Sequence, residues 1–279
     1  MAPMSPNPVL YESHCHTPLC KHALGLPAEY AAAAKERGFK GIIFTDHCPL
    51  PDRVSAALRM APEQFPDYVR LIDEVRSLYA GQVDVRLGLE SDYFPGLEPW
   101  LRELHSRAGL NFVLGSVHTH VAEYRAQYLR GEDWFAFQKT YFEHLAMAAE
   151  SALFDCLAHP DLVKNERPAA WHFARIEPFI ERSLDRIAAT GVAMELNTSG
   201  VNKSYPEMNP GLSMLRLMHA RGIPVVIGAD AHRPQRVGDG YVHALRMLKS
   251  VGYSEVSYFL ERNRQTIPIK VALASLGES

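Results

Sequence analysis

Long hydrophobic runs are absent from this chain. Nowhere do about 18 apolar residues follow one another, and the amino-terminal stretch MAPMSPNPVLYESH has no basic segment that precedes a long apolar one. The first absence argues against a membrane-spanning helix, and the second argues against a secretory signal. We therefore expect a cytoplasmic protein without a membrane partner.

Blocks of like charge and paired cysteines are also absent. The net charge is only −3, and without a basic block the chain offers no electrostatic surface for nucleic acid. A small-molecule partner is therefore expected. The four cysteines show no paired framework, and we interpret them as small buried thiols rather than as metal ligands.

The chain does contain enough apolar material for a large core. Its 279 residues are 47% hydrophobic, which suits one barrel or one large α/β domain. No internal repeat, linker or low-complexity segment divides the sequence. Residues 1–279 are therefore expected to form a single domain.

Short β-rich runs alternate with longer amphipathic runs. Strand character begins at Val9 and recurs in six further runs, at 41–45, 83–89, 112–117, 153–158, 192–196 and 223–229. Helical periodicity occupies 26–37, 62–79, 95–107, 134–150, 173–190 and 212–221. We expect long loops at 119–133 and 160–171, and one or two helices and a tail from Gly238 onward.

Repeated βα units predict parallel strands that are joined by crossover helices. Seven such units suggest closure into a distorted, TIM-like (β/α)7 barrel. In a barrel of this kind the carboxyl ends of all strands meet on one face, and the active site lies there.

Polar side chains stand at or just after these strand ends. They are His14, His16, Asp46, His47, Glu90, His118, His159, Asn197, Asp230 and His232, with His22 a little beyond the first strand. A single histidine is more often structural, but this joint pattern predicts one shared site. Structural or surface roles are assigned to the histidines in predicted helices, which are His105, His144, His172, His219 and His243. For His120 an exposed loop position is favoured over a substrate contact.

Imidazoles combined with two carboxylates suit divalent zinc, iron or manganese. One ion would not need nine ligands, so two or three ions are expected, with Glu90 placed to bridge a pair. Neighbouring ions about 3.5–4 Å apart activate water at neutral pH and neutralise the oxygens of a phosphoryl group. The residue set therefore predicts hydrolysis of a phosphate ester.

The motifs around these residues resemble those of the PHP (polymerase and histidinol phosphatase) superfamily. In chain order they are HCH (14–16), TDH (45–47), GLE (88–90), SVH (116–118), AHPD (158–161) and GADAH (228–232). The segments CKHA (20–23) and ELNTSG (195–200) are similar to those of the stand-alone histidinol-phosphatases of histidine biosynthesis. The resemblance implies a distorted (β/α)7 barrel with a trinuclear metal centre.

The resemblance also implies how the ligands divide among three ions. One ion would be held by His14, His16, Glu90 and Asp230, a second by Glu90, His118 and His159, and a third by His22, His47 and His232. Asp46, Glu90 and His118 are the expected catalytic residues. Asp46 has no ion assigned to it, and two roles are open: it orients a ligand, or it protonates the leaving alkoxide as general acid.

The expected reaction is hydrolysis of L-histidinol phosphate to L-histidinol and phosphate. Expected substrate contacts are Asn197 and four cations, which are Lys164, Arg167, Lys203 and Arg233. The family resemblance places an arginine where this chain has Asn202, followed by Lys203. The substrate also carries an ammonium and an imidazole, for which Glu123, Glu166 and Glu207 are open candidates as acceptors.

Two other functions stay open at this stage. The first is a PHP phosphoesterase that acts on nucleotides or other small phosphate esters. The second is a PHP-like binding module for a polymerase in which the metals are structural. The absence of an attached polymerase segment or of a basic surface argues against this module.

Overall fold

The computed structural model describes residues 7–278. The ends of the predicted single domain, 1–6 and 279, lie outside this range. The main sheet has nine strands in chain order, with eight strands parallel and the last antiparallel. The strands are β1 Tyr11–Cys15, β2 Gly41–Phe44, β3 Asp84–Asp92, β4 Phe112–Ser116, β5 Cys156–Leu157, β6 Ala193–Asn197, β7 Val225–Gly228, β8 Glu255–Leu260 and β9 Asn263–Pro268.

The first seven strands form a ring that closes at its carboxyl end. There the backbone N–H of His16 donates to the Ala231 carbonyl, and the N–H of Ala231 donates to the His14 carbonyl, both over 3.0 Å. These bonds join the end of β1 to the segment that follows β7. The predicted seven-stranded, TIM-like barrel is therefore confirmed, and its seam lies beside the predicted metal ligands.

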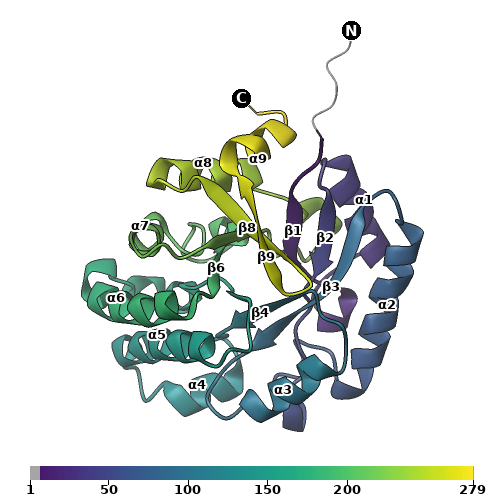
Figure 1. The fold of residues 1–279 in the computed structure, drawn as a ribbon. Helices are drawn as coiled ribbons and strands as arrows, with labels where there is room; N and C mark the ends of the chain where they lie inside the picture. Colours follow the sequence, from purple (N-terminus) through teal and green to yellow (C-terminus); the bar gives the residue numbers. More distant parts are fainter. Residues whose placement is uncertain (1–6, 279) are drawn as a thin grey trace.

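The β8–β9 hairpin covers the opposite, amino-terminal end of the ring. The ring of Tyr258 stacks on Tyr11 with centroids 4.9 Å apart, and Phe259 stacks on Phe112 at 5.2 Å. Phe259 belongs to the apolar cluster inside the barrel. Figure 1 shows the yellow hairpin reaching from beside β1 to the middle of the ring.

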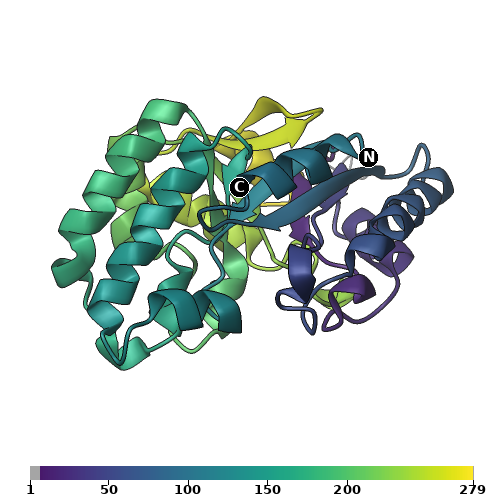
Figure 2. The same cartoon turned by 90° about the horizontal axis from the view of Figure 1, so that it is seen from below.

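Helices surround the strands (Figure 1). Figure 2 shows the teal and green helices on one side of the strands and the purple and blue helices on the other. Amphipathic spacing explains this position, because in α6 the buried residues Ile176, Ile180, Leu184 and Ile187 recur at helical intervals. The helices are α1 Pro27–Glu36, α2 Phe65–Leu78, α3 Glu98–Ser106, α4 Ala122–Tyr128, α5 Trp134–Glu150, α6 Phe173–Thr190, α7 Leu212–Ala220, α8 Tyr241–Val251 and α9 Ile269–Ser275.

Three sequence predictions differ from the structure. The segment 255–268 forms a hairpin, although helices and a tail were expected there. Its turn uses Glu261 and Arg262 with positive φ instead of the glycine or asparagine that usually marks a hairpin. The expected loop 119–133 contains α4, and the expected loop 160–171 contains two short 3₁₀ helices, Leu162–Asn165 and Pro168–Ala170.

Within residues 7–278, no helix combines the length and the apolar character that a membrane crossing requires.

Candidate metal centre

All nine predicted metal ligands converge at the carboxyl end of the barrel. His14 and Glu90 lie within β1 and β3, and the other seven lie in loops that follow the strands. Most of these side chains line a cavity of about 870 Å³, a size within the usual range for small-molecule sites. Side chains from strand ends far apart in the sequence therefore lie together in space.

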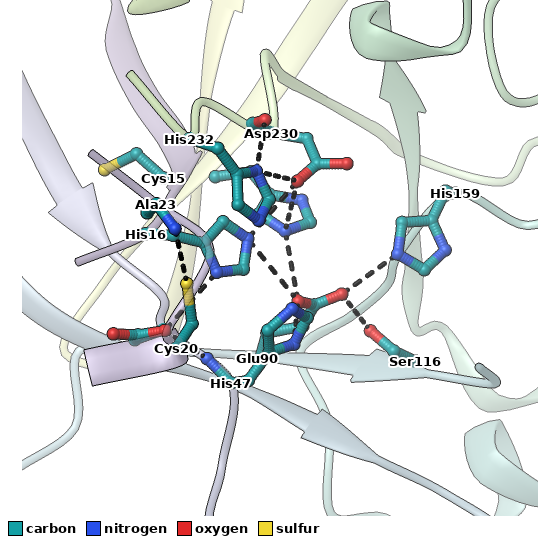
Figure 3. Close-up of polar contacts among 12 residues, drawn as sticks. Cys15, His16, Cys20, Ala23, His47, Glu90, Ser116, His159, Asp230 and His232 are labelled. Atoms are coloured by element: carbon teal, nitrogen blue, oxygen red, sulfur yellow. Dashed lines mark hydrogen bonds and ion pairs between the residues drawn. The ribbon is translucent and has the colours of Figure 1, made fainter. Parts of the chain in front are cut away.

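Glu90 lies at the centre of this cluster. Its Oε1 is 2.9 Å from His159 Nε2 and 3.2 Å from His118 Nε2. Its Oε2 is 2.9 Å from His47 Nδ1. Burial by itself would raise the pKa of Glu90, but the neighbouring imidazoles outweigh burial and hold that pKa well below its usual range. Figure 3 shows this carboxylate between histidines from different loops, with Ser116 beside it.

A second group lies on the β1 side of the cavity. His16 Nε2 is 3.2 Å from Asp230 Oδ1, and His14 Nε2 is 3.7 Å from the same oxygen. One ligand atom from each of these three side chains lies within 4.8 Å of the others. Burial would raise the pKa of Asp230, but Lys203 and the neighbouring histidines hold it well below its usual range. Asp230 is therefore an anionic partner for a cation bound between the two imidazoles.

His22 and His232 supply a third group together with His47. The Nδ1 of His22 lies 2.7 Å from the Cys20 carbonyl, and the Nδ1 of His232 lies 3.1 Å from the Asp230 carbonyl. A carbonyl only accepts, so each Nδ1 must donate, and in the neutral imidazoles each Nε2 carries a lone pair. The two Nε2 atoms are 2.9 Å apart. Two lone pairs repel at this distance, whereas a divalent cation would draw both nitrogens toward itself.

Unpartnered buried atoms also favour cations at this site. His14 Nε2, His16 Nε2, His47 Nδ1 and Glu90 Oε2 are buried, and although they lie close to other polar atoms of the cluster, none of these contacts has the geometry of a hydrogen bond. Leaving such groups unpaired costs free energy. All four belong to the cluster described above, and zinc, iron and manganese accept nitrogen and oxygen ligands of these types. The residues present therefore fit a multinuclear divalent metal centre.

Carboxylates contact several of these imidazoles at Nδ1, the ring nitrogen that faces away from the other predicted ligands. Glu195 Oε1 is 2.7 Å from His14 Nδ1, and Asp92 Oδ1 is 3.0 Å from His118 Nδ1. Each contact directs Nε2 of the imidazole toward Glu90, an arrangement that is common in metal sites. Sequence reasoning quoted Glu195 only within a motif and missed Asp92. The available signal was the twofold alternation of a strand, which places Glu195 on the same side of β6 as Asn197.

Asp46 is buried beneath His16. Its Oδ1 lies 3.4 Å from His16 Nδ1 and accepts from the backbone N–H of His47, while its Oδ2 accepts from the Thr17 hydroxyl. It is fully buried and is not part of the cavity wall. Of the two roles left open by the sequence, this position favours orientation of His16 over proton delivery to a leaving group.

The predicted substrate contacts divide into two groups. Lys203 and Arg233 line the cavity, whereas Lys164, Arg167 and Asn197 do not.

The structure gives each of these three another environment. Lys164 is fully buried and donates to Asp161, Glu207 and the Met208 carbonyl. Arg167 is exposed, and Asn197 is buried and donates to Glu195. Lys164 and Arg167 lie in the irregular segment after β5, where no periodicity predicts the direction of a side chain, and Asn197 ends β6. Their role as substrate contacts stays a prediction.

Several cavity residues were not predicted as site residues. His120 is exposed in a turn, as expected, and it also lines the cavity with its ring centroid 5.0 Å from that of His118. The other lining residues include Asn165, Ser199, Asn202, Ser204 and Arg236, together with Glu166, which the sequence left open as an acceptor.

Several known proteins are similar to this chain in sequence and fold. Residues 12–199 match the PHP domain model. The chain is 38% identical over 272 residues to the probable histidinol-phosphatase of Deinococcus radiodurans, which covers 93% of this chain and 99% of the relative. It is 26% identical to the histidinol-phosphatase of Bacillus subtilis, across 82% of this chain and 96% of that protein. The histidinol phosphate phosphatase of Lactococcus lactis, solved with Zn, L-histidinol and phosphate, aligns with a TM-score of 0.77 at 18% identity, covering 92% of this chain and 98% of that one.

Proposed function

The chain belongs to the PHP domain family, and we propose that it is a metal-dependent phosphomonoesterase that hydrolyses L-histidinol phosphate to L-histidinol and phosphate in histidine biosynthesis. The observation that carries this proposal is the gathering of seven imidazoles and two carboxylates at the carboxyl end of the barrel. The full-length similarity to a probable histidinol-phosphatase supports the choice of substrate.

We propose that the site holds three divalent ions of zinc, iron or manganese. His14, His16, Glu90 and Asp230 would hold the first ion, and Glu90, His118 and His159 the second. The third would be held by His22, His47 and His232. When bound, such ions lower the pKa of a water molecule and neutralise charge on a phosphoryl group. Zinc in the Lactococcus lactis protein supports a divalent metal here.

The chain's own cations would bind the phosphoryl oxygens. Lys203 and Arg233 reach the cavity from the loops after β6 and β7, and Arg236 lines the same cavity. The Nζ of Lys203 lies 3.3 Å from Asp230 Oδ2, so it stands beside the predicted ligands of the first ion. Charge-assisted bonds from such groups orient a phosphomonoester and stabilise the charge of its transition state.

Buried contacts keep the ligands in place during the reaction. Ser116 donates to Glu90 Oε1 over 2.5 Å, and the Arg59 guanidinium makes a two-pronged ion pair with Asp92, which in turn holds His118. These residues fix the direction of Glu90 and His118, the two expected catalytic side chains at the centre. Asp46 does the same for His16.

The decisive experiment compares substrates on metal-loaded protein of measured metal content. We expect kcat/KM for L-histidinol phosphate to exceed that for nucleotide and sugar monophosphates and for phosphodiesters. Glu90→Gln is the matched inactive variant: it should lose bound metal and turnover while the thermal unfolding midpoint of the metal-free protein stays close to that of wild type. A higher kcat/KM on a nucleotide or sugar phosphate would replace this function with that of another PHP phosphoesterase.

The remaining sequence predictions concern context. We propose that the chain forms a single domain, because β1 pairs with the segment after β7 and the last hairpin packs inside the same barrel. The cytoplasmic location and the absence of a nucleic-acid partner stay predictions.

A further inference from the structure

Glu166 is a carboxylate on the cavity wall that the metal centre does not use. Within residues 7–278 the wall contains three carboxylates, those of Glu90, Asp230 and Glu166. The first two belong to the metal cluster. Glu166 comes from the loop after β5, and its side chain is 8% exposed. An acidic group in the same cavity as a phosphate-binding centre repels a phosphoryl dianion. Its presence in the wall therefore suits a ligand group other than the phosphate.

Two neighbours hold Glu166 in position but do not use all of its capacity to accept hydrogen bonds. Its Oε1 accepts from the Thr119 hydroxyl over 2.9 Å, and its Oε2 accepts from the Arg125 guanidinium. An ionised carboxylate has about four lone-pair positions, so this side chain retains acceptor capacity. Because Glu166 also lines the cavity, that capacity is available to a bound molecule.

Charge is distributed unevenly around the cavity. The cations Lys203, Arg233 and Arg236 come from the loops after β6 and β7, whereas Glu166 and Thr119 come from the loops after β5 and β4. These two pairs of loops are neighbours around the ring, since the strands follow chain order. A ligand with a phosphate at one end and a cation at the other would complement this distribution, with its phosphate near the three cations and its cation near Glu166.

We propose that Glu166 accepts a hydrogen bond from the cationic, nitrogen-bearing end of the substrate and so determines specificity for aminated phosphomonoesters. This inference rests on the proposed function, because it concerns the part of the substrate that does not react. It also distinguishes among the three acceptors that the sequence left open. The carboxylate of Glu123 accepts from the Ser55 backbone outside the cavity wall, and Glu207 pairs with the buried Lys164.

The test uses Glu166→Gln in the metal-loaded full chain, with L-histidinol phosphate and p-nitrophenyl phosphate as substrates. The second substrate has a phosphate but no cation. Loss of a charge-assisted hydrogen bond predicts a fall of about 10- to 100-fold in kcat/KM for L-histidinol phosphate, mainly through KM. For p-nitrophenyl phosphate the change should stay within about twofold. Calorimetric affinity for L-histidinol should fall in parallel with the first substrate.

Two control variants separate recognition from structural effects. Glu123→Gln removes a nearby acid that does not line the cavity and should leave both substrates unaffected. Arg125→Gln removes the ion-pair partner of Glu166, whose side chain is 42% exposed. If Glu166 served only to pair with Arg125, both members of the pair would show the same loss. We expect instead that Arg125→Gln retains the preference for L-histidinol phosphate.

The outcomes distinguish this proposal from the proposed function. Equal losses on both substrates, or no loss on either, would overturn the role of Glu166 while leaving the phosphatase assignment intact. A wild-type protein that does not hydrolyse L-histidinol phosphate would instead overturn the assignment itself.

Discussion

The carboxylate of Glu195 determines which ring nitrogen His14 presents to Glu90 and Asp230. Its Oε1 lies 2.7 Å from His14 Nδ1, and its Oε2 accepts from the backbone N–H of His159 over 2.8 Å. One side chain on β6 therefore positions an imidazole from β1 and the backbone that carries an imidazole after β5. Both histidines are predicted ligands, and they belong to different proposed ions.

Glu195→Gln should weaken metal binding without removing a ligand. The amide lacks the negative charge that makes His14 a better electron donor, and loss of such a partner typically costs about 10- to 100-fold in metal affinity. Metal titration with a competing chelator measures the change. Glu150→Gln, which removes an exposed acid paired with Arg186, is the control and should bind metal like wild type. Unchanged affinity in Glu195→Gln would show that this contact does not tune the site.

Asp46→Asn tests orientation of His16 against proton donation. If Asp46 orients His16, the variant should lose part of its metal and kcat should fall with it, while the pH of half-maximal activity stays unchanged. If Asp46 donates the proton, the metal content should stay complete and the alkaline limb of the pH–rate profile should disappear. Metal analysis and a pH profile of kcat on the same preparation distinguish the two results.

Lys164→Met should reduce stability rather than substrate binding. The buried ammonium lies 2.8 Å from Asp161 and 2.9 Å from Glu207, and removal of one partner of a buried ion pair typically costs about 3–5 kcal/mol. Urea unfolding measures this loss. Lys203→Met is the matched variant and should do the opposite, with a higher KM for L-histidinol phosphate and nearly unchanged stability. A raised KM with normal stability in Lys164→Met would restore its predicted role as a substrate contact.

His144 should make the fold sensitive to acid. It is 5% exposed, lies 2.9 Å from the Tyr124 hydroxyl, and burial lowers its pKa to about 4 from the usual 6.5. Between these values the unfolded chain binds more protons than the folded one, so the free energy of unfolding falls as the pH is lowered through this window. His144→Gln should remove about 3 kcal/mol of that dependence between pH 7 and pH 4.

Urea unfolding at several pH values measures this change in slope. His172→Gln alters an exposed histidine and serves as the control. An identical pH dependence in wild type and His144→Gln would contradict the prediction.

The proximity of the predicted ligands could be inferred from the sequence because two regular patterns combined. Apolar runs identified strands, the helices between them implied parallel crossovers, and polar residues at the strand ends then had to converge. His14 and Asp230 are more than two hundred positions apart, yet this topology brings His14 Nε2 within 3.7 Å of Asp230 Oδ1. No residue-level detail of the loops was needed.

Loop side chains and an unusual turn were less predictable. Lys164 and Lys203 both follow strand ends, but only Lys203 lines the cavity, since Lys164 folds back onto Asp161 one helical turn earlier. The β8–β9 hairpin was missed because a Glu261–Arg262 turn has no ordinary sequence signature. Asp92 was missed because its function depends on contact with His118 across neighbouring strands.

The β8–β9 hairpin limits the route by which small molecules enter and leave the barrel. It packs Tyr258 against Tyr11 and Phe259 against Phe112. It seals the base of the ring, whose interior is filled with apolar side chains. Substrate and both products must therefore pass through the opening at the carboxyl end of the barrel. Inorganic phosphate leaves the site through the same opening by which the next substrate enters.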